Sequence, residues 1–211
     1  MSLFRPTALR YIRNLGCAAG LILAMLSLWS ASAMAAPDGS DAELAVCPGQ
    51  TFSQPFEAFG DSNFYTLVEG SEFNGGAEGW ELKNGANVVA GQRPDGSPGN
   101  VLDLPSGAIA ISPVVCVTLQ YPTARTWVES VDGNGGVTVG VYYSGARPAA
   151  RPVGRLNAKD GDGWTLSKPF NIKPQLAGSQ EGVREVRFAY VNTTRASDLH
   201  IWGLYVDPRM R

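Results

Sequence analysis

Residues 136–144 read GVTVGVYYS, and residues 183–192 read VREVRFAYVN. In both segments, apolar residues alternate with small or polar ones, which is the period-two pattern of a half-buried β-strand. Glycine turns such as 132–136 interrupt the chain between segments of this kind. Further strand candidates cover 64–69, 78–83, 87–90, 100–104, 107–118, 124–131 and 199–206. We therefore predict an all-β fold, a single antiparallel β-sandwich, with no helix in the mature chain.

The first 35 residues have the features of a secretory signal peptide. Arg5, Arg10 and Arg13 precede an apolar run at 17–29, and Ala33-Met34-Ala35 supplies a small-residue cleavage site. The apolar run is shorter than the roughly 20 residues that span a bilayer. We predict a secretory signal peptide over 1–35, a flexible N-terminal stub over 36–43 and one β-sandwich domain over 44–211. The mature protein is then secreted, extracellular or periplasmic, with no membrane anchor.

The charge of the mature chain excludes some partners. Residues 36–211 keep all 19 acidic residues but only 14 of the 17 basic ones, which gives a net charge of −5. Nucleic acids and anionic membranes are poor partners for such a chain, because it has no basic run or patch. Its 25 glycines and 14 prolines, counted over the whole sequence, suit a turn-rich β protein.

Two cysteines, Cys47 and Cys116, remain after cleavage. In an exported chain they most simply pair with each other, although two buried free thiols are the alternative. Closing a loop of about 70 residues is worth roughly 4 kcal/mol in the chain-entropy model. A single histidine and the absence of a C-x-x-C motif exclude a histidine-based or zinc-ribbon metal site.

Two short motifs suggest a serine hydrolase. Residues 59–62 read FGDS and residues 198–200 read DLH, which together resemble the skeleton of a GDSL-type enzyme. However, a strand-like segment follows Ser62 where that class has a helix, and Asp198 and His200 do not have the D-x-x-H spacing. We therefore interpret the first motif as a turn, in which Asp61 or Ser62 bonds nearby backbone N–H groups. The chain is predicted not to be an enzyme, and the hydrolase stays as the lesser alternative.

Residues 59–91 resemble the first strands of galactose-binding-like jelly rolls, the fold of many carbohydrate-binding modules. The residues that match are Leu67, Val68, Gly70, Phe73, Gly75, Gly79 and Trp80, and the tail 204–208 looks like the last strand of such modules. The mature chain is also similar to a group of uncharacterised secreted bacterial proteins, through the segments 104–107, 112–113, 116–117, 122–125 and 186–188. The resemblance implies a jelly-roll sandwich and a glycan or another extracellular ligand, although this fold hosts many roles.

The resemblance also bears on calcium, which many sugar-binding modules of this fold hold with a Glu after the Phe and a late Asp-Asp pair. Here Asn74 follows Phe73, and Trp202-Gly203 occupy the Asp-Asp positions. Calcium prefers several carboxylate or carbonyl oxygens, so these changes weaken such a site. We expect no cofactor and assign no metal ligand; Asp160 and Asp162 leave a weaker structural calcium site open.

A sugar site uses flat aromatic faces with a few fixed polar groups beside them. Trp29 leaves with the signal peptide, and Trp80 is expected in the core. The candidate ligand-binding residues are therefore Trp127, Trp164, Trp202 and Arg187. For each tryptophan, packing in the core is the competing interpretation. The alternative function is a structural or protein-interaction module of the cell envelope.

Overall fold

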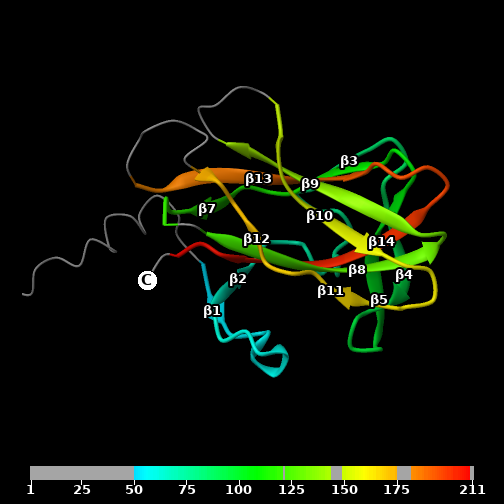
Figure 1. Cartoon of the computed structure of the whole chain (residues 1–211), viewed down its shortest axis with the longest axis horizontal. Helices are drawn as coiled ribbons and strands as arrows, with labels where there is room; N and C mark the ends of the chain where they lie inside the picture. Colours follow the sequence, from blue (N-terminus) through cyan, green and yellow to red (C-terminus); the bar gives the residue numbers. More distant parts are fainter. Residues whose placement is uncertain (1–49, 121, 144–148, 175–181, 210–211) are drawn as a thin grey trace, which may run out of the picture. The chain divides into compact units, whose positions relative to one another are not determined.

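The computed structural model describes residues 50–209 except 121, 144–148 and 175–181 (Figure 1). All of these residues belong to one compact unit of the chain, Pro37–Arg211. The predicted signal peptide, the stub at 36–43 and Cys47 lie outside the described residues. Within them the chain forms β-strands and one turn of 3-10 helix, η1 (Glu57–Phe59).

Two antiparallel sheets form the sandwich that the alternation predicted (Figure 1). The eight-stranded sheet contains β1 (Phe52–Ser53), β2 (Tyr65–Leu67), β4 (Asn87–Gln92), β5 (Pro98–Pro105), β8 (Thr123–Asp132), β11 (Thr165–Leu166), β12 (Phe170–Asn171) and β14 (Asp198–Asp207). The six-stranded sheet contains β3 (Glu81–Lys83), β6 (Ile109–Ile111), β7 (Val115–Val117), β9 (Gly135–Tyr143), β10 (Arg151–Ala158) and β13 (Arg184–Asn192).

The last two long strands take central places in the two sheets. β13 lies between β9 on one side and β6 and β7 on the other. β14 lies between β8 on one side and β2 and β5 on the other. From β8 onward the chain passes repeatedly between the sheets, from β8 to β9, from β10 to β11, from β12 to β13 and from β13 to β14. This is the topology of a jelly-roll sandwich, as the resemblance implied.

Alternate residues of these strands fill the space between the sheets. The inward-facing core includes Val137, Val139, Val141, Val186, Phe188, Tyr190, Val128, Leu102, Leu104, Leu199, Ile201, Leu204 and Val206. Trp80 is 7% exposed and stacks on Tyr190 with ring centroids 6.2 Å apart, so its expected core position is confirmed. The polar and half-buried residues between these core positions consequently point to the outer faces of the sandwich.

Three local predictions differ from the structure. The candidate strand 107–118 is two strands, β6 and β7, separated at Ser112-Pro113, because proline cannot donate a ladder hydrogen bond. No strand is predicted between 144 and 183, but Arg151–Ala158 form β10, whose register with β9 shifts between Pro152 and Gly154 and thereby hides the alternation. The single helical turn η1 was not predicted, because three residues are too few to show a period.

Candidate functional site

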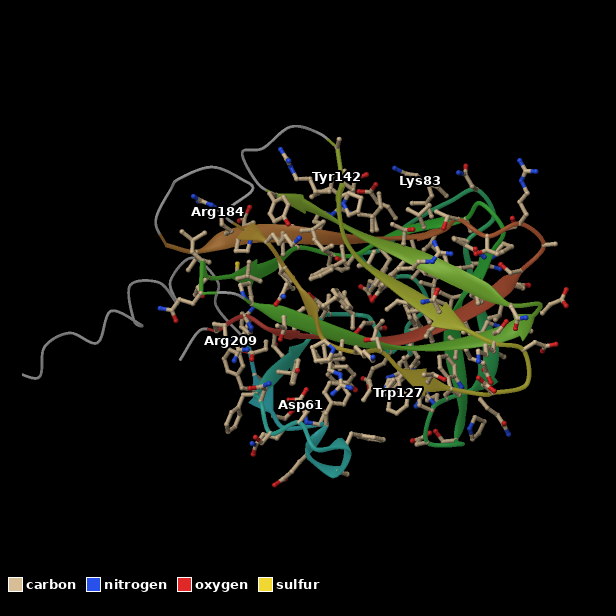
Figure 2. All side chains as sticks on the ribbon, in the orientation of Figure 1. Asp61, Lys83, Trp127, Tyr142, Arg184 and Arg209 are labelled. Carbon is tan, nitrogen blue, oxygen red and sulfur yellow. The ribbon has the colours of Figure 1, made fainter. Side chains whose placement is uncertain are left out.

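Two tryptophans lie opposite each other on the outer face of the eight-stranded sheet. Trp127 of β8 is the register partner of Trp202 of β14. Thr126 and Val128, which flank Trp127, are buried on the core side, so the Trp127 side chain points outward. Figure 2 shows Trp127 on the side of this sheet that faces away from the six-stranded sheet. Both tryptophans are half-buried.

A β-bulge at Gly203 follows Trp202. The register passes from Trp202 opposite Trp127 to Leu204 opposite Thr126, so Gly203 is an extra residue in β14. Its φ is +64°, and a Cβ there would lie 2.7 Å from Tyr205 Cε2, which is why glycine is needed. The extra residue lets Trp202 face outward while Leu204 faces the core.

Trp202 combines the two roles that the sequence left open. Its ring packs partly against the hydrophobic core, and its Nε1 is buried with no hydrogen-bond partner among the described residues. The remainder of the half-buried side chain is open to solvent. Trp202 therefore fills space and also presents part of its ring on the outer face.

Phe59, the first residue of the FGDS motif, extends this aromatic surface. It ends the helical turn η1, and its side chain is 58% exposed. Its ring meets Trp127 edge to face, with centroids 5.5 Å apart and an interplanar angle of 75°. Phe59 is not among the predicted site residues, because nothing local to the FGDS motif indicates a contact with β8.

His200 lies two residues before Trp202 on the same outward face of β14. Its register partners are Asp103 of β5 and Glu129 of β8. His200 Nε2 is 3.7 Å from Asp103 Oδ1, and His200 Nδ1 is 3.7 Å from Glu129 Oε2. The imidazole is therefore held between two carboxylates from the neighbouring strands.

Trp164 is added to this face by the chain between β10 and β11. Its ring stacks on the His200 ring, with centroids 6.4 Å apart and an interplanar angle of 27°. Its Nε1 donates a hydrogen bond of 2.9 Å to the backbone oxygen of Gln92, which fixes the indole. We call Phe59, Trp127, Trp164 and Trp202 the aromatic platform.

The acid–histidine cluster, formed by Asp103, Glu129, Asp198 and His200, has shifted protonation equilibria. Burial raises the pKa of Asp103 to about 6, and a hydrogen bond and the negative charge of Asp198 add to the effect. Burial also raises the pKa of Glu129 and lowers the pKa of His200, the latter against the opposing charge of Asp198. No ion pair within the described part of the chain joins these acids to a Lys or Arg. The cluster is therefore net negative near neutral pH.

Arg187 lies on the other sheet. It alternates on β13 with Val186 and Phe188, which face the core, so it points to the outer face of the six-stranded sheet. Its Nη1 is 2.7 Å from Glu81 Oε1, and its Nε donates a 2.8 Å hydrogen bond to Ser112 O. It borders a pocket of about 190 Å³ that Tyr142 also lines. The structure thus brings the three candidate tryptophans to one face and leaves Arg187 on the opposite one.

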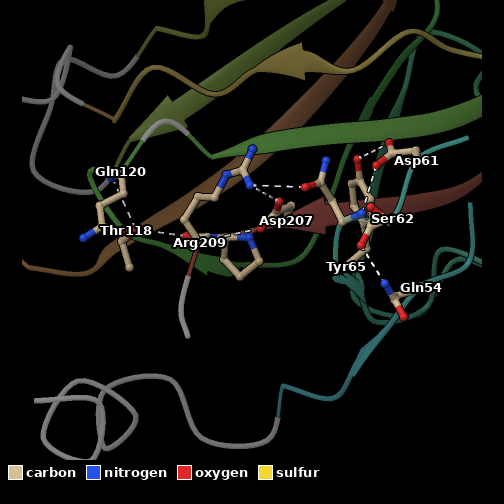
Figure 3. A network of polar contacts seen from close by, with 10 residues as sticks. Gln54, Asp61, Ser62, Tyr65, Thr118, Gln120, Asp207 and Arg209 are labelled. Atoms are coloured by element: carbon tan, nitrogen blue, oxygen red, sulfur yellow. Dashed lines mark hydrogen bonds and ion pairs between the residues drawn. The ribbon is translucent and has the colours of Figure 1, made fainter. Parts of the chain in front are cut away.

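The FGDS stretch forms the predicted turn (Figure 3). Asp61 Oδ1 accepts a 3.1 Å hydrogen bond from the backbone N–H of Asn63, and Oδ2 accepts a 2.7 Å bond from the Tyr65 hydroxyl. Ser62 is exposed, and its backbone oxygen accepts a hydrogen bond from Gln54. None of the hydrogen bonds within the described segments links Ser62 to His200, whose neighbours are the two carboxylates and Trp164.

The described residues form no metal site and no membrane-spanning helix. Among the described residues, no group of three or more His, Cys, Asp or Glu side chains is arranged to hold a metal ion. Asn74, which stands where sugar-binding modules of this fold keep a glutamate, accepts a hydrogen bond from Arg93. No helix in the described ranges is long and apolar enough to cross a bilayer.

No protein-family model matches this chain, and no curated protein matches it. Among solved structures, it is similar to the C-terminal CBM6 of the marine laminarinase LamC from Zobellia galactanivorans, with 16% identity, a TM-score of 0.42 and coverage of 63% of this chain and 95% of that one. It is also similar to TmCBM61, solved with β-1,4-galactotriose, with 14% identity, a TM-score of 0.42 and coverage of 66% and 95%. A third is the CBM22-1–GH10 part of xylanase 10B from Clostridium thermocellum, complexed with xylohexaose, with 11% identity, a TM-score of 0.49 and coverage of 65% and 28%. The chain is thus similar in structure to carbohydrate-binding modules.

Proposed function

We propose that this protein is a secreted, non-catalytic β-sandwich module that binds glycan on the outer face of its eight-stranded sheet. The observation that carries the proposal is the aromatic platform, in which four rings from separate parts of the chain gather on one face. Flat aromatic rings stack on the C–H faces of sugar rings. The neighbouring carboxylates supply hydrogen-bond acceptors for sugar hydroxyl groups.

Apart from the inner part of Trp202, the platform does not fill the core. The largest fully buried side chains are elsewhere and include Tyr65, Tyr190, Phe56, Phe73 and Phe188. Single exposed aromatic residues are ordinary on protein surfaces, whereas a contiguous exposed group marks an interaction site. Strand register and the indole hydrogen bond of Trp164 hold the rings in place before a ligand arrives, which lowers the entropy cost of binding.

Secretion and the Cys47–Cys116 bond belong to the same proposal. Gln50, three residues after Cys47, donates a 3.2 Å hydrogen bond to the backbone oxygen of Cys116. Three residues of chain span at most about 11 Å, so this contact supports the proposed pairing. The bond would tie the start of the domain to β7.

A glycan array probed with purified residues 36–211, followed by titration calorimetry on the best sugar, tests the proposed binding. Trp127→Ala is expected to weaken binding by about 1–3 kcal/mol, or roughly 5- to 150-fold, because it removes a central aromatic anchor. Tyr142→Ala is the matched control, since Tyr142 is a half-buried aromatic residue on the opposite sheet. Its variant is expected to bind like the wild type.

Two outcomes would favour the alternatives. A folded protein that binds no glycan but captures a cell-envelope component would favour the structural or protein-interaction module. A fluorophosphonate label that attaches to the wild type and not to Ser62→Ala would favour the serine hydrolase. Ser62 is exposed and makes no hydrogen bond to His200, which supports the prediction that the protein is not a serine hydrolase.

A further inference from the structure

We infer that the acid–histidine cluster makes the aromatic platform selective for sugars that carry a protonated amino group, and selective against anionic sugars. This inference rests on the proposed glycan binding and names the substrate class of the same face. It has two independent bases, the position of the carboxylates and their lack of a counter-cation.

The carboxylates lie beside the platform. Glu129 and Trp127 are successive outward residues of β8, and His200 and Trp202 are the corresponding residues of β14. Outward residues two positions apart on one strand are separated by about 6.6 Å. A sugar stacked on the Trp127–Trp202 pair therefore lies next to the pair of outward residues formed by Glu129 and His200. Asp103, the partner of His200 on β5, lies in line with that pair.

The carboxylates are not neutralised by protein cations. His200 lies 3.7 Å from both Asp103 and Glu129, but burial disfavours its charged form. Arg125 is the outward residue of β8 just before Trp127, and its guanidinium is already paired with Asp61 at 2.9 Å. The half-buried acids are consequently costly to keep charged, and the raised pKa of Asp103 is the expected sign of this cost.

A ligand ammonium group would be stabilised twice. It would neutralise carboxylates that make no ion pair with a Lys or Arg among the described residues, and it would be attracted to the electron-rich faces of the tryptophan rings. A uronic acid would instead bring a second negative charge to the cluster, which is unfavourable at this distance. A neutral sugar gains only the stacking and hydrogen bonds, so its affinity falls between the two.

Titration calorimetry of residues 36–211 at pH 6.5 and low salt, where the glucosamine amines carry substantial positive charge and Asp103 is still mostly ionised, tests the selectivity with three tetrasaccharides. These are the tetramers of glucosamine, of N-acetylglucosamine and of galacturonic acid. We expect the glucosamine tetramer to bind about tenfold more tightly than its N-acetylated form, and the galacturonic acid tetramer more weakly than both. Below about pH 6 the amines stay protonated while Asp103 takes up a proton, so the preference should shrink there.

Glu129→Gln is expected to reduce the tenfold preference to about threefold or less, because it removes the charge and keeps the shape and a hydrogen-bond acceptor. Glu185 is an exposed acid on the opposite sheet, so Glu185→Gln is the matched control and should keep the preference.

Equal or tighter binding of the neutral or acidic tetramer would refute the selectivity and leave glycan binding intact. If the folded protein binds none of the three tetramers and no sugar on the array, the proposed function and this inference both fail. Choline that binds as tightly as the glucosamine tetramer would show an ammonium site that does not recognise sugar, which also overturns the inference.

Discussion

Asp61→Ala tests whether the FGDS stretch is a structural turn. The Asp61 carboxylate is 12% exposed and makes an ion pair of 2.9 Å with Arg125, in addition to its bonds with Tyr65 and Asn63. Figure 2 shows Asp61 beside the outer face of the eight-stranded sheet. Arg125 is itself 8% exposed, so the substitution leaves a buried guanidinium without its carboxylate.

The expected cost follows from what Arg125 keeps. Removing one partner of a buried ion pair typically costs about 3–5 kcal/mol. Arg125 Nε still donates to Ser167 O at 2.9 Å, and its guanidinium still lies 4.8 Å from the centre of the Phe56 ring. We therefore expect the lower end, about 3 kcal/mol, which corresponds to a loss of roughly 6–12 °C in Tm for a domain of this size. Ser62→Ala removes an exposed hydroxyl and should change stability by no more than about 0.5 kcal/mol.

The same pair gives a pH dependence with a defined sign. Burial alone raises the pKa of Asp61, but hydrogen bonds from Tyr65, the Asn63 backbone and Arg125 outweigh it and hold the pKa below its usual 3.8. A carboxyl group with a lowered pKa in the folded state stabilises the protein above its unfolded pKa. This contribution is lost as the pH falls through the folded pKa, so the difference in stability between wild type and Asp61→Ala should narrow as the pH falls below about 3.8.

Urea unfolding followed by tryptophan fluorescence at pH 7 measures these differences. The double variant Asp61→Ala/Arg125→Met should be less destabilised than the sum of the single variants, because it leaves no unpaired charge. Equal costs for Asp61→Ala and Ser62→Ala, or strict additivity in the double variant, would refute the structural role assigned to this turn.

Three further predictions concern the rest of the domain. Mass spectrometry of non-reduced peptides should show Cys47 linked to Cys116, and two freely alkylated thiols in the secreted protein would end that pairing. Trp202→Ala should lower the free energy of unfolding by about 2–3 kcal/mol, which is less than the cost of truncating a fully buried aromatic residue, and it should also weaken glycan binding. A denaturation curve with unchanged stability would contradict the packing role of Trp202. Asp103→Asn should raise Tm at pH 7 by the equivalent of about 1–1.5 kcal/mol, which is half or less of the roughly 3 kcal/mol that the full pKa shift would give, because the group is only partly buried. A carboxyl group with its pKa raised to about 6 stabilises the fold below its unfolded pKa and loses that contribution as the pH rises through about 6. The Tm values of the wild type and Asp103→Asn should therefore be equal near pH 4. A Tm difference that does not vary with pH would contradict this prediction.

The alternation of residues 136–144 and 183–192 predicted β9 and β13 to within one residue at each end. The prediction succeeded because one face of each strand packs in the core and the other faces water. Apolar and polar residues therefore alternate along the strand, and this alternation is visible between adjacent residues. The same reasoning placed the longer strands β5, β8 and β14. It failed for β10, an edge strand in which a bulge breaks the period.

The sequence by itself therefore determined the fold class, the export features and the tryptophans worth testing. It did not determine which of them share a face. Trp127 and Trp202 meet because β8 and β14 pair in this register, and the extra residue Gly203 moves the side chains that follow it to the other face, so that Leu204 faces the core. Phe59 and Trp164 reach the same face from distant loops, and Arg187 lies on the other sheet because β13 does. Such positions depend on pairing between segments far apart in the chain, which no local pattern encodes, and so only the tertiary structure decided them.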